Sequence, residues 1–121
     1  MAGNADELNE LNGLFEKVSG YFALLSEPTR LKILHSLCNT ERSVGDIVEA
    51  LGATQANVSR HLNLMHRAGV LARRKDGNLV FYSVCDPNAV SLCRAVCTNM
   101  MAMPDKPLKR ASARRFMASV A

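Results

Sequence analysis

The chain lacks any apolar run close to the roughly 20 residues that a helix needs to cross a bilayer. Its acidic, Asn-rich start also lacks the basic and apolar regions of a signal peptide. We therefore expect a cytoplasmic protein with no membrane partner. In that reducing compartment the four cysteines should remain thiols for metal binding or redox chemistry, because structural disulfide frameworks belong to secreted proteins.

Motifs of catalytic sites are also missing. The sequence has no Gly-rich phosphate loop, no Cys-x-x-Cys pair and no His-Glu metal motif, and no base lies beside a nucleophile. A small thiol- or metal-dependent enzyme is therefore the least favoured function. There is no internal repeat, and 121 residues with 48% hydrophobic content predict one small domain with a modest core.

Acidic residues are absent from one long segment. Between Thr54 and Lys75 there is no Asp or Glu against five Arg and Lys, so the segment carries a formal charge of +5. The whole chain carries +4, with −4 in residues 1–29 and +4 in the last eighteen residues. Basic charge concentrated in this way indicates a partner with many phosphates.

The first part of this basic segment predicts an amphipathic helix over Thr54–Ala68. Val58, Leu62 and Met65 recur at helical spacing and form a stripe that must be buried. Thr54 is the expected N-cap, and Gly69 ends the helix because it tolerates positive φ. Polar side chains gather near the helix start, where a helix in a major groove presents its first turns to base edges: Gln55, Asn57, Ser59 and Arg60.

The second part predicts a β-hairpin. Residues 70–72 and 79–84 are rich in apolar, β-branched and aromatic side chains, and Asp76-Gly77 suits a tight turn. We expect the loop between these strands to carry Arg73, Arg74 and Lys75 toward phosphates. A charged turn or an amphipathic helix alone is more often an ordinary surface element, but their direct succession favours a nucleic-acid interface.

Helices are also expected on both sides of this segment. A wide apolar stripe from Leu8 to Leu25 predicts a first helix, and Pro28 opens a second over Thr29–Leu37. Ser43 caps a third helix that Gly52 ends, so the third and fourth helices form a helix-turn-helix. The last helix covers Asn88–Met103, after Asp86 as cap. Residues 104–121 form a basic, flexible tail.

From Asn12 to Met103 the chain resembles the ArsR/SmtB family of bacterial winged-helix repressors. The residues that carry the resemblance are LSEPTRLKILHSL (25–37), SVGDIVEALGATQANVSRHLNLMHRAGVL (43–71) and RRKDGNLVFYSVCDP (73–87). The resemblance implies a mainly α fold with a two-stranded β-wing and a homodimer formed through the first and last helices. Residues 1–103 then form one domain for DNA binding and dimerisation. The implied function is a repressor that leaves its operator when a metal ion, metalloid or oxidant reaches a sensing site.

Double-stranded operator DNA is therefore the expected partner, with one half-site for each subunit. Gln55, Asn57 and Arg60 are the candidates for base contacts. Contacts to phosphates are assigned to the remaining polar and basic side chains of the helix and hairpin, namely Thr54, Ser59, His61, Arg73, Arg74 and Lys75.

The sensing chemistry is expected at the cysteines. Cys93 and Cys97 lie four residues apart on one helix, so two thiolates could share a soft ion. Cys85 lies about 12 Å away along that helix, too far for the same ion with bonds of about 2.3 Å. If the last helices pack antiparallel, as the resemblance implies, Cys85 joins Cys93 and Cys97 of the partner subunit. The favoured inducer is then As(III) or another thiophilic metal ion, and no cofactor is required.

Two features of the family are absent from this sequence. Its Cys-Val-Cys metal box is replaced by Ser43-Val44-Gly45-Asp46-Ile47, so that arsenite site is not expected here. Its zinc set on the last helix keeps only Asp86, because Asn88, Asn99 and Ala102 stand where imidazole or carboxylate would be expected.

Two alternatives remain for the cysteines. Cys38 could pair with Cys93 or Cys97 in a dithiol switch, which the resemblance implies for the family's sulfide- and oxidant-responsive members. All the cysteines could instead be small packing residues in a repressor without an inducer.

Overall fold

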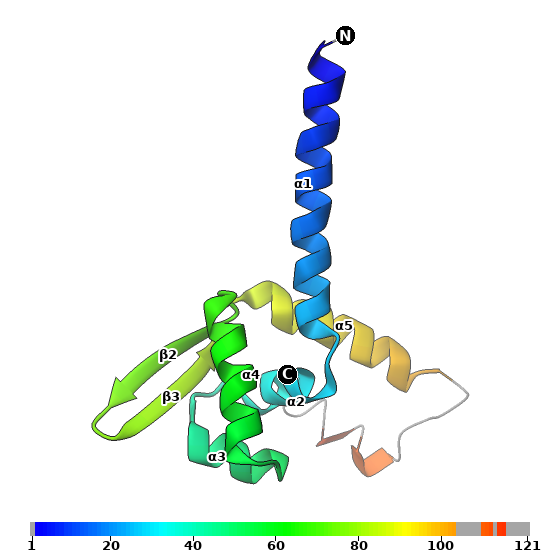
Figure 1. The fold of residues 1–121 in the computed structure, drawn as a ribbon. Coiled ribbons are helices and arrows are strands. Elements are labelled where there is room, and N and C mark those ends of the chain that lie inside the picture. The colour runs from blue at the N-terminus through cyan, green and yellow to red at the C-terminus, as the bar shows by residue number, and fades with distance from the viewer. Residues whose placement is uncertain (1, 104–109, 113, 116–121) are drawn as a thin grey trace.

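A computed structural model describes residues 2–103, 110–112 and 114–115 of the chain. The element order is helix, helix, strand, two helices, hairpin and helix (Figure 1). The bounds are α1 Ala2–Leu25, α2 Pro28–Ser36, β1 Arg42–Ser43, α3 Val44–Leu51, α4 Gln55–Arg67, β2 Leu71–Asp76, β3 Leu79–Val84 and α5 Pro87–Met101. Most of the predicted flexible tail lies outside the described residues.

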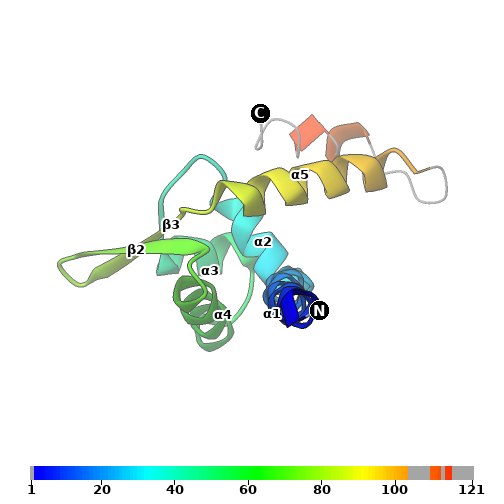
Figure 2. The same ribbon diagram turned by 90° about the horizontal axis from the view of Figure 1, so that it is seen from above.

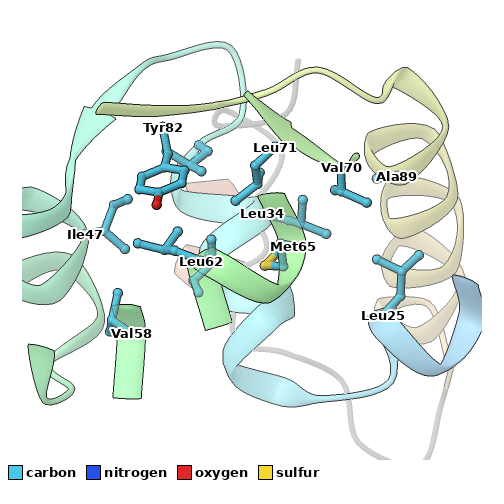
Figure 3. Packing of buried hydrophobic residues seen from close by; sticks show 12 residues of the cluster. Leu25, Leu34, Ile47, Val58, Leu62, Met65, Val70, Leu71, Tyr82 and Ala89 are labelled. Carbon is cyan, nitrogen blue, oxygen red and sulfur yellow. The ribbon is translucent and has the colours of Figure 1, made fainter. Parts of the chain in front are cut away.

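The core lies where α2, α3 and α4 meet the start of the hairpin. Side chains from these elements point toward one another in Figure 3, with Leu34, Ile47, Leu62 and Tyr82 among them. Val58, Leu62 and Met65 of α4 are fully buried, which confirms the predicted apolar stripe. This burial fixes the rotation of α4 about its own axis, and so decides which side chains face solvent.

Side-chain caps set the starts of the helices. The oxygens of Ser43, Thr54 and Asp86 accept hydrogen bonds from backbone N–H groups at the starts of α3, α4 and α5, as expected. Glu27 caps α2 by accepting from the backbone N–H of Arg30 at 3.0 Å, which the sequence analysis did not foresee. Gly52 ends α3 with a φ of 63°, in the left-handed region that a side chain disfavours.

The hairpin of β2 and β3 confirms the predicted two-stranded wing, but two of its details were not predicted. Its sheet has three strands in the order β1-β3-β2, because Arg42 and Ser43 pair with Tyr82 and Phe81 of β3. The hairpin ladder also continues to the pair Asp76 and Leu79, which leaves only two residues in the turn. The three basic residues expected in a loop therefore lie on β2, where alternate side chains point to opposite faces.

Helix α1 extends away from the other elements, and α5 runs across its base (Figures 1 and 2). The Tyr21 hydroxyl ties the two helices together by donating to Asp86 Oδ2 at 2.7 Å. Burial, and then this hydrogen bond, raise the pKa of Tyr21 above its usual range, so the phenol remains the donor. Most of the apolar stripe of α1 is exposed, with 60% exposure at Leu8 and 54% at Phe22, whereas Leu25 at its end is buried in the core. No helix in the described part of the chain is long and apolar enough to span a membrane.

Two leucines of α4 provide a matched test of the core. We expect Leu62→Ala to lower the free energy of unfolding by about 2–5 kcal/mol, because Leu62 is completely buried. Leu64→Ala makes the same chemical change at 39% exposure and should cost less than about 1 kcal/mol. Urea unfolding at one fixed protein concentration measures both, and equal losses would contradict the orientation of α4.

Candidate nucleic-acid interface and thiol cluster

The outward face of α4 lies beside the wing. Gln55, Ser59 and Asn63 recur every four residues, so they share one face of the helix. They line one hollow of about 360 Å³ together with Arg73 of β2. Amide, hydroxyl and guanidinium groups thus converge from two elements on a surface with no carboxylate in its lining. Such a surface suits phosphates and base edges.

The start of α4 carries the other predicted contacts. Asn57 Oδ1 accepts a hydrogen bond from Arg60 Nη2 at 2.8 Å, and this bond holds the Arg60 guanidinium against the helix. The Thr54 hydroxyl accepts from the backbone N–H of Asn57 at 3.3 Å, so its oxygen serves as the helix cap. Gln55 and Arg60 are exposed, and Asn57 is half-buried. Arg60 can therefore reach a base edge only by leaving or sharing Asn57.

The three basic residues of β2 are not equivalent. Arg74 donates to both carboxylate oxygens of Glu41, at 2.7 and 3.1 Å, and its guanidinium lies 4.6 Å from the centre of the Phe81 ring. This pairing lowers the pKa of Glu41. Arg73 and Lys75 point to the opposite face of the strand. Arg74 thus braces the wing, while Arg73 is the wing cation that lies beside α4.

His61, which was predicted to contact a phosphate, is buried in the isolated subunit. Only 5% of this residue is exposed, because it belongs to the buried side of α4. Its Nδ1 lies 3.3 Å from Arg30 Nη1, and its Nε2 lies 3.7 Å from Glu27 Oε2. Arg30 also donates to the backbone carbonyls of Ala23 and Leu24 at the end of α1. His61 therefore links α4 to α2 and, through Arg30, to α1, and its burial disfavours the predicted contact with a phosphate.

Two asparagines that line the hollow between α4 and the wing, Asn63 and Asn78, were not predicted as site residues. Asn63 was recognisable, because it continues the four-residue spacing of Gln55 and Ser59. Asn78 had no comparable signal. Its place beside α4 depends on the two-residue turn at Gly77 and Asn78, whereas the predicted turn was Asp76-Gly77.

Three of the four cysteines gather between α2 and α5. Cys38, which follows α2, lines a small cavity of about 40 Å³ together with Cys93 and Cys97 of α5. Cys85 lies apart from this thiol cluster. It is exposed before α5, and its thiol donates to the carbonyl of Gly69 at 3.3 Å. The structure thus places Cys38 with the i, i+4 pair and leaves Cys85 outside.

Burial raises the pKa of Cys93, and the neighbouring thiols of Cys97 and Cys38 raise it further. Burial also raises the pKa of Cys38, against a smaller opposing effect of the Arg94 guanidinium. These two groups are therefore protonated at neutral pH. Because the thiolate is the reactive form, their reactions should become faster as pH rises.

No three His, Cys, Asp or Glu side chains within the described ranges come together in a way that could hold a metal ion. Asp86, the residue that matches the family's zinc set, has both carboxylate oxygens engaged. Oδ1 accepts from the backbone N–H of Asn88 at 3.0 Å, and Oδ2 accepts from Tyr21. A metal site of three ligands would thus need a second subunit or a change in side-chain positions.

Comparison with known proteins identifies the family. Residues 27–73 match the model described as the arsR family of bacterial regulatory proteins. A helix-turn-helix-type transcriptional regulator of Mycobacterium tuberculosis is 36% identical over 84 residues, which cover 69% of this chain and 74% of that protein. The chain belongs to the ArsR family.

Other ArsR-type relatives agree with this assignment. The cadmium resistance transcriptional regulatory protein CadC of Listeria innocua is 44% identical over 68 residues, which cover 55% of this chain and 57% of CadC. The crystal structure of NolR from Sinorhizobium fredii superposes with a TM-score of 0.71 at 26% identity, covering 78% of this chain and 94% of NolR. The protein is thus a DNA-binding transcriptional repressor with a winged helix-turn-helix fold, and not an enzyme.

Arg73 gives a direct test of the wing. We expect Arg73→Ala to weaken binding to all duplex sequences alike and to reduce the salt slope of binding by about 1, because a phosphate contact carries no sequence information. Lys17→Ala, on the helix that extends away from the wing, removes the same charge and should leave the slope unchanged. Electrophoretic titrations at several salt concentrations measure both. A change in sequence preference without a change in slope would contradict the assignment.

Proposed function

We propose that this ArsR-family protein is a homodimeric repressor that leaves its operator when the thiols of Cys38, Cys93 and Cys97 react. The convergence of these three side chains on one cavity carries the proposal. Cys38 is separated from the other two by more than fifty residues, so only the fold brings them together. A disulfide from Cys38 to Cys93 or Cys97 would join α2 to α5 covalently.

The exposed apolar side chains support the homodimer. Leu11, Phe15 and Phe22 of α1, and Val96 and Met100 of α5, are 46–61% exposed. Apolar faces of this kind usually mark an interface. Pairing through α1 and α5 would present two copies of α4 to half-sites about one helical turn apart on the operator.

Contacts through α2 offer a route from the cysteines to the DNA-binding surface. Helix α2 packs against α4, and its Arg30 contacts both His61 of α4 and the end of α1. A disulfide between Cys38, at the end of α2, and α5 would change how α1 and α5, the helices proposed to form the dimer, pack against α2 and α4. A coupling of about 1–3 kcal/mol between the thiol site and the operator would weaken binding about 5- to 150-fold, which is enough for a switch.

The thiol cluster can be tested by operator titration after oxidation with the neutral reagent 4,4′-dithiodipyridine. Wild-type affinity should fall about 5- to 150-fold and recover with excess dithiothreitol. Cys38→Ser should bind the operator normally and resist the oxidant, whereas Cys85→Ser should respond like wild type. Peptide mapping should show Cys38 linked to Cys93 or Cys97. An unchanged affinity of oxidised wild-type protein, or a normal response of Cys38→Ser, contradicts the proposal.

A second candidate signal is a soft ion held across the dimer. Cys85 is exposed at the start of α5, and Cys93 and Cys97 lie one turn apart on the same helix. Antiparallel packing of two α5 helices would bring Cys85 of one subunit to the pair of the other, giving three thiolates for As(III), Cd²⁺ or a similar ion. The similarity to CadC, named for cadmium resistance, favours testing this class of inducer.

Two serine variants separate these signals. If the ion site spans the dimer, Cys85→Ser should abolish release by arsenite or cadmium and leave the oxidant response intact, while Cys38→Ser should do the reverse. Operator titrations with each reagent give the answer. Release by arsenite and cadmium that survives Cys85→Ser would exclude the intersubunit site.

A further inference from the structure

We propose that the hollow in front of Cys38 is an entrance that favours anionic disulfides and polysulfides as the reagents that reach the thiol cluster. The inference rests on the proposed thiol-responsive function and names the chemical class of its signal. It depends on the hollow that adjoins the cysteine cavity and on the charges along its walls.

An open hollow of about 850 Å³ lies between α2, β1 and α3. Leu31, His35 and Cys38 line this hollow and also line the small cavity that contains Cys93 and Cys97. Cys38 therefore stands at the junction of the two spaces. Of the four cysteines only Cys38 lines the hollow, so a small molecule held there contacts the Cys38 thiol.

The polar lining of the hollow is basic. Lys32 and Arg42 belong to it together with His35, and no carboxylate does. Lys32 is exposed, while Arg42 donates from Nε to the carbonyl of Ser36 at 2.7 Å, which holds its guanidinium at the wall. Neither cation takes part in a salt bridge with another described residue. A concave surface with charge of one sign attracts small ions of the opposite sign and raises their rate of arrival.

The reagent reacts with the thiol cluster by thiol–disulfide exchange in two steps. The Cys38 thiolate attacks one sulfur of the entering disulfide, the S–S bond of the reagent breaks, and one half leaves as a thiolate. The thiolate of Cys93 or Cys97 then attacks Cys38 Sγ and expels the second half. The two cysteines are oxidised to a disulfide, the reagent is reduced to two thiols, and the protons of the two cysteines pass to solvent or to the leaving groups.

Two reagents of opposite character test the inference. The dianion 5,5′-dithiobis(2-nitrobenzoate) and the neutral 4,4′-dithiodipyridine both report thiol exchange by absorbance. The measurement uses Cys85→Ser protein without DNA, in which we expect the fastest phase of thiol exchange to come from Cys38. That fast phase should be lost with either reagent in the double variant Cys38→Ser, Cys85→Ser. Lys32→Glu should slow the fast phase with the dianion about 3- to 10-fold and leave the neutral reagent unchanged. This difference should vanish near 1 M salt, where the Debye length is about 3 Å.

Lys17→Glu is the matched control, because Lys17 is exposed on α1 and lines neither the hollow nor the cysteine cavity, and it should change neither rate. Equal slowing of both reagents by Lys32→Glu, no slowing of either, or a fast phase that persists without Cys38 would overturn the inference. These rates are measured without an operator. A negative operator titration would therefore not contradict the proposed entrance. Likewise, unexpected thiol-exchange rates would not contradict release of the operator by thiol oxidation.

Discussion

The burial of one apolar stripe on α4 is the constraint on which the rest of the structure depends. Val58, Leu62 and Met65 are inaccessible to solvent. Only one rotation of α4 about its own axis buries all three side chains. That rotation turns Gln55 and Ser59 toward the wing. The same packing that stabilises the domain therefore also leaves the polar face of α4 accessible beside the wing.

Helix α2 is the element that connects the other functional parts. Its Arg30 binds the last carbonyls of α1 and the buried His61 of α4, and Cys38 follows its last turn. Helices α1 and α4 and the thiol cluster thus all adjoin one nine-residue helix. In the proposed mechanism, a new bond at Cys38 acts on this helix and hence on both neighbours. The required coupling is small compared with the total stability of a domain.

The sequence predicted those features that depend on local periodicity or on caps. The order of helices, the caps at Ser43, Thr54 and Asp86, and the buried stripe of α4 all follow from spacing and side-chain chemistry. The hairpin was predicted, but its turn was placed one residue early, because the cross-strand pair of Asp76 and Leu79 left no local signal.

Features that depend on contacts between distant residues were harder to predict. The polar character of His61 suggested a phosphate contact, yet its partners, Arg30 and Glu27, lie more than thirty residues away. The gathering of Cys38 with Cys93 and Cys97 likewise depends on how α5 crosses α2. The spacing of the cysteines in the sequence was compatible both with this grouping and with an intersubunit site formed by Cys85, Cys93 and Cys97.

The central claim is that the outward face of α4 and the adjoining wing contact DNA. Titration of isotope-labelled protein with an operator duplex, followed by amide and side-chain NMR, tests it most directly. We expect the largest shift changes at Gln55, Ser59, Asn63 and Arg73, and smaller ones at the cavity that contains Cys93. Shift changes centred on α1 or on the cavity, with none along α4, would contradict it.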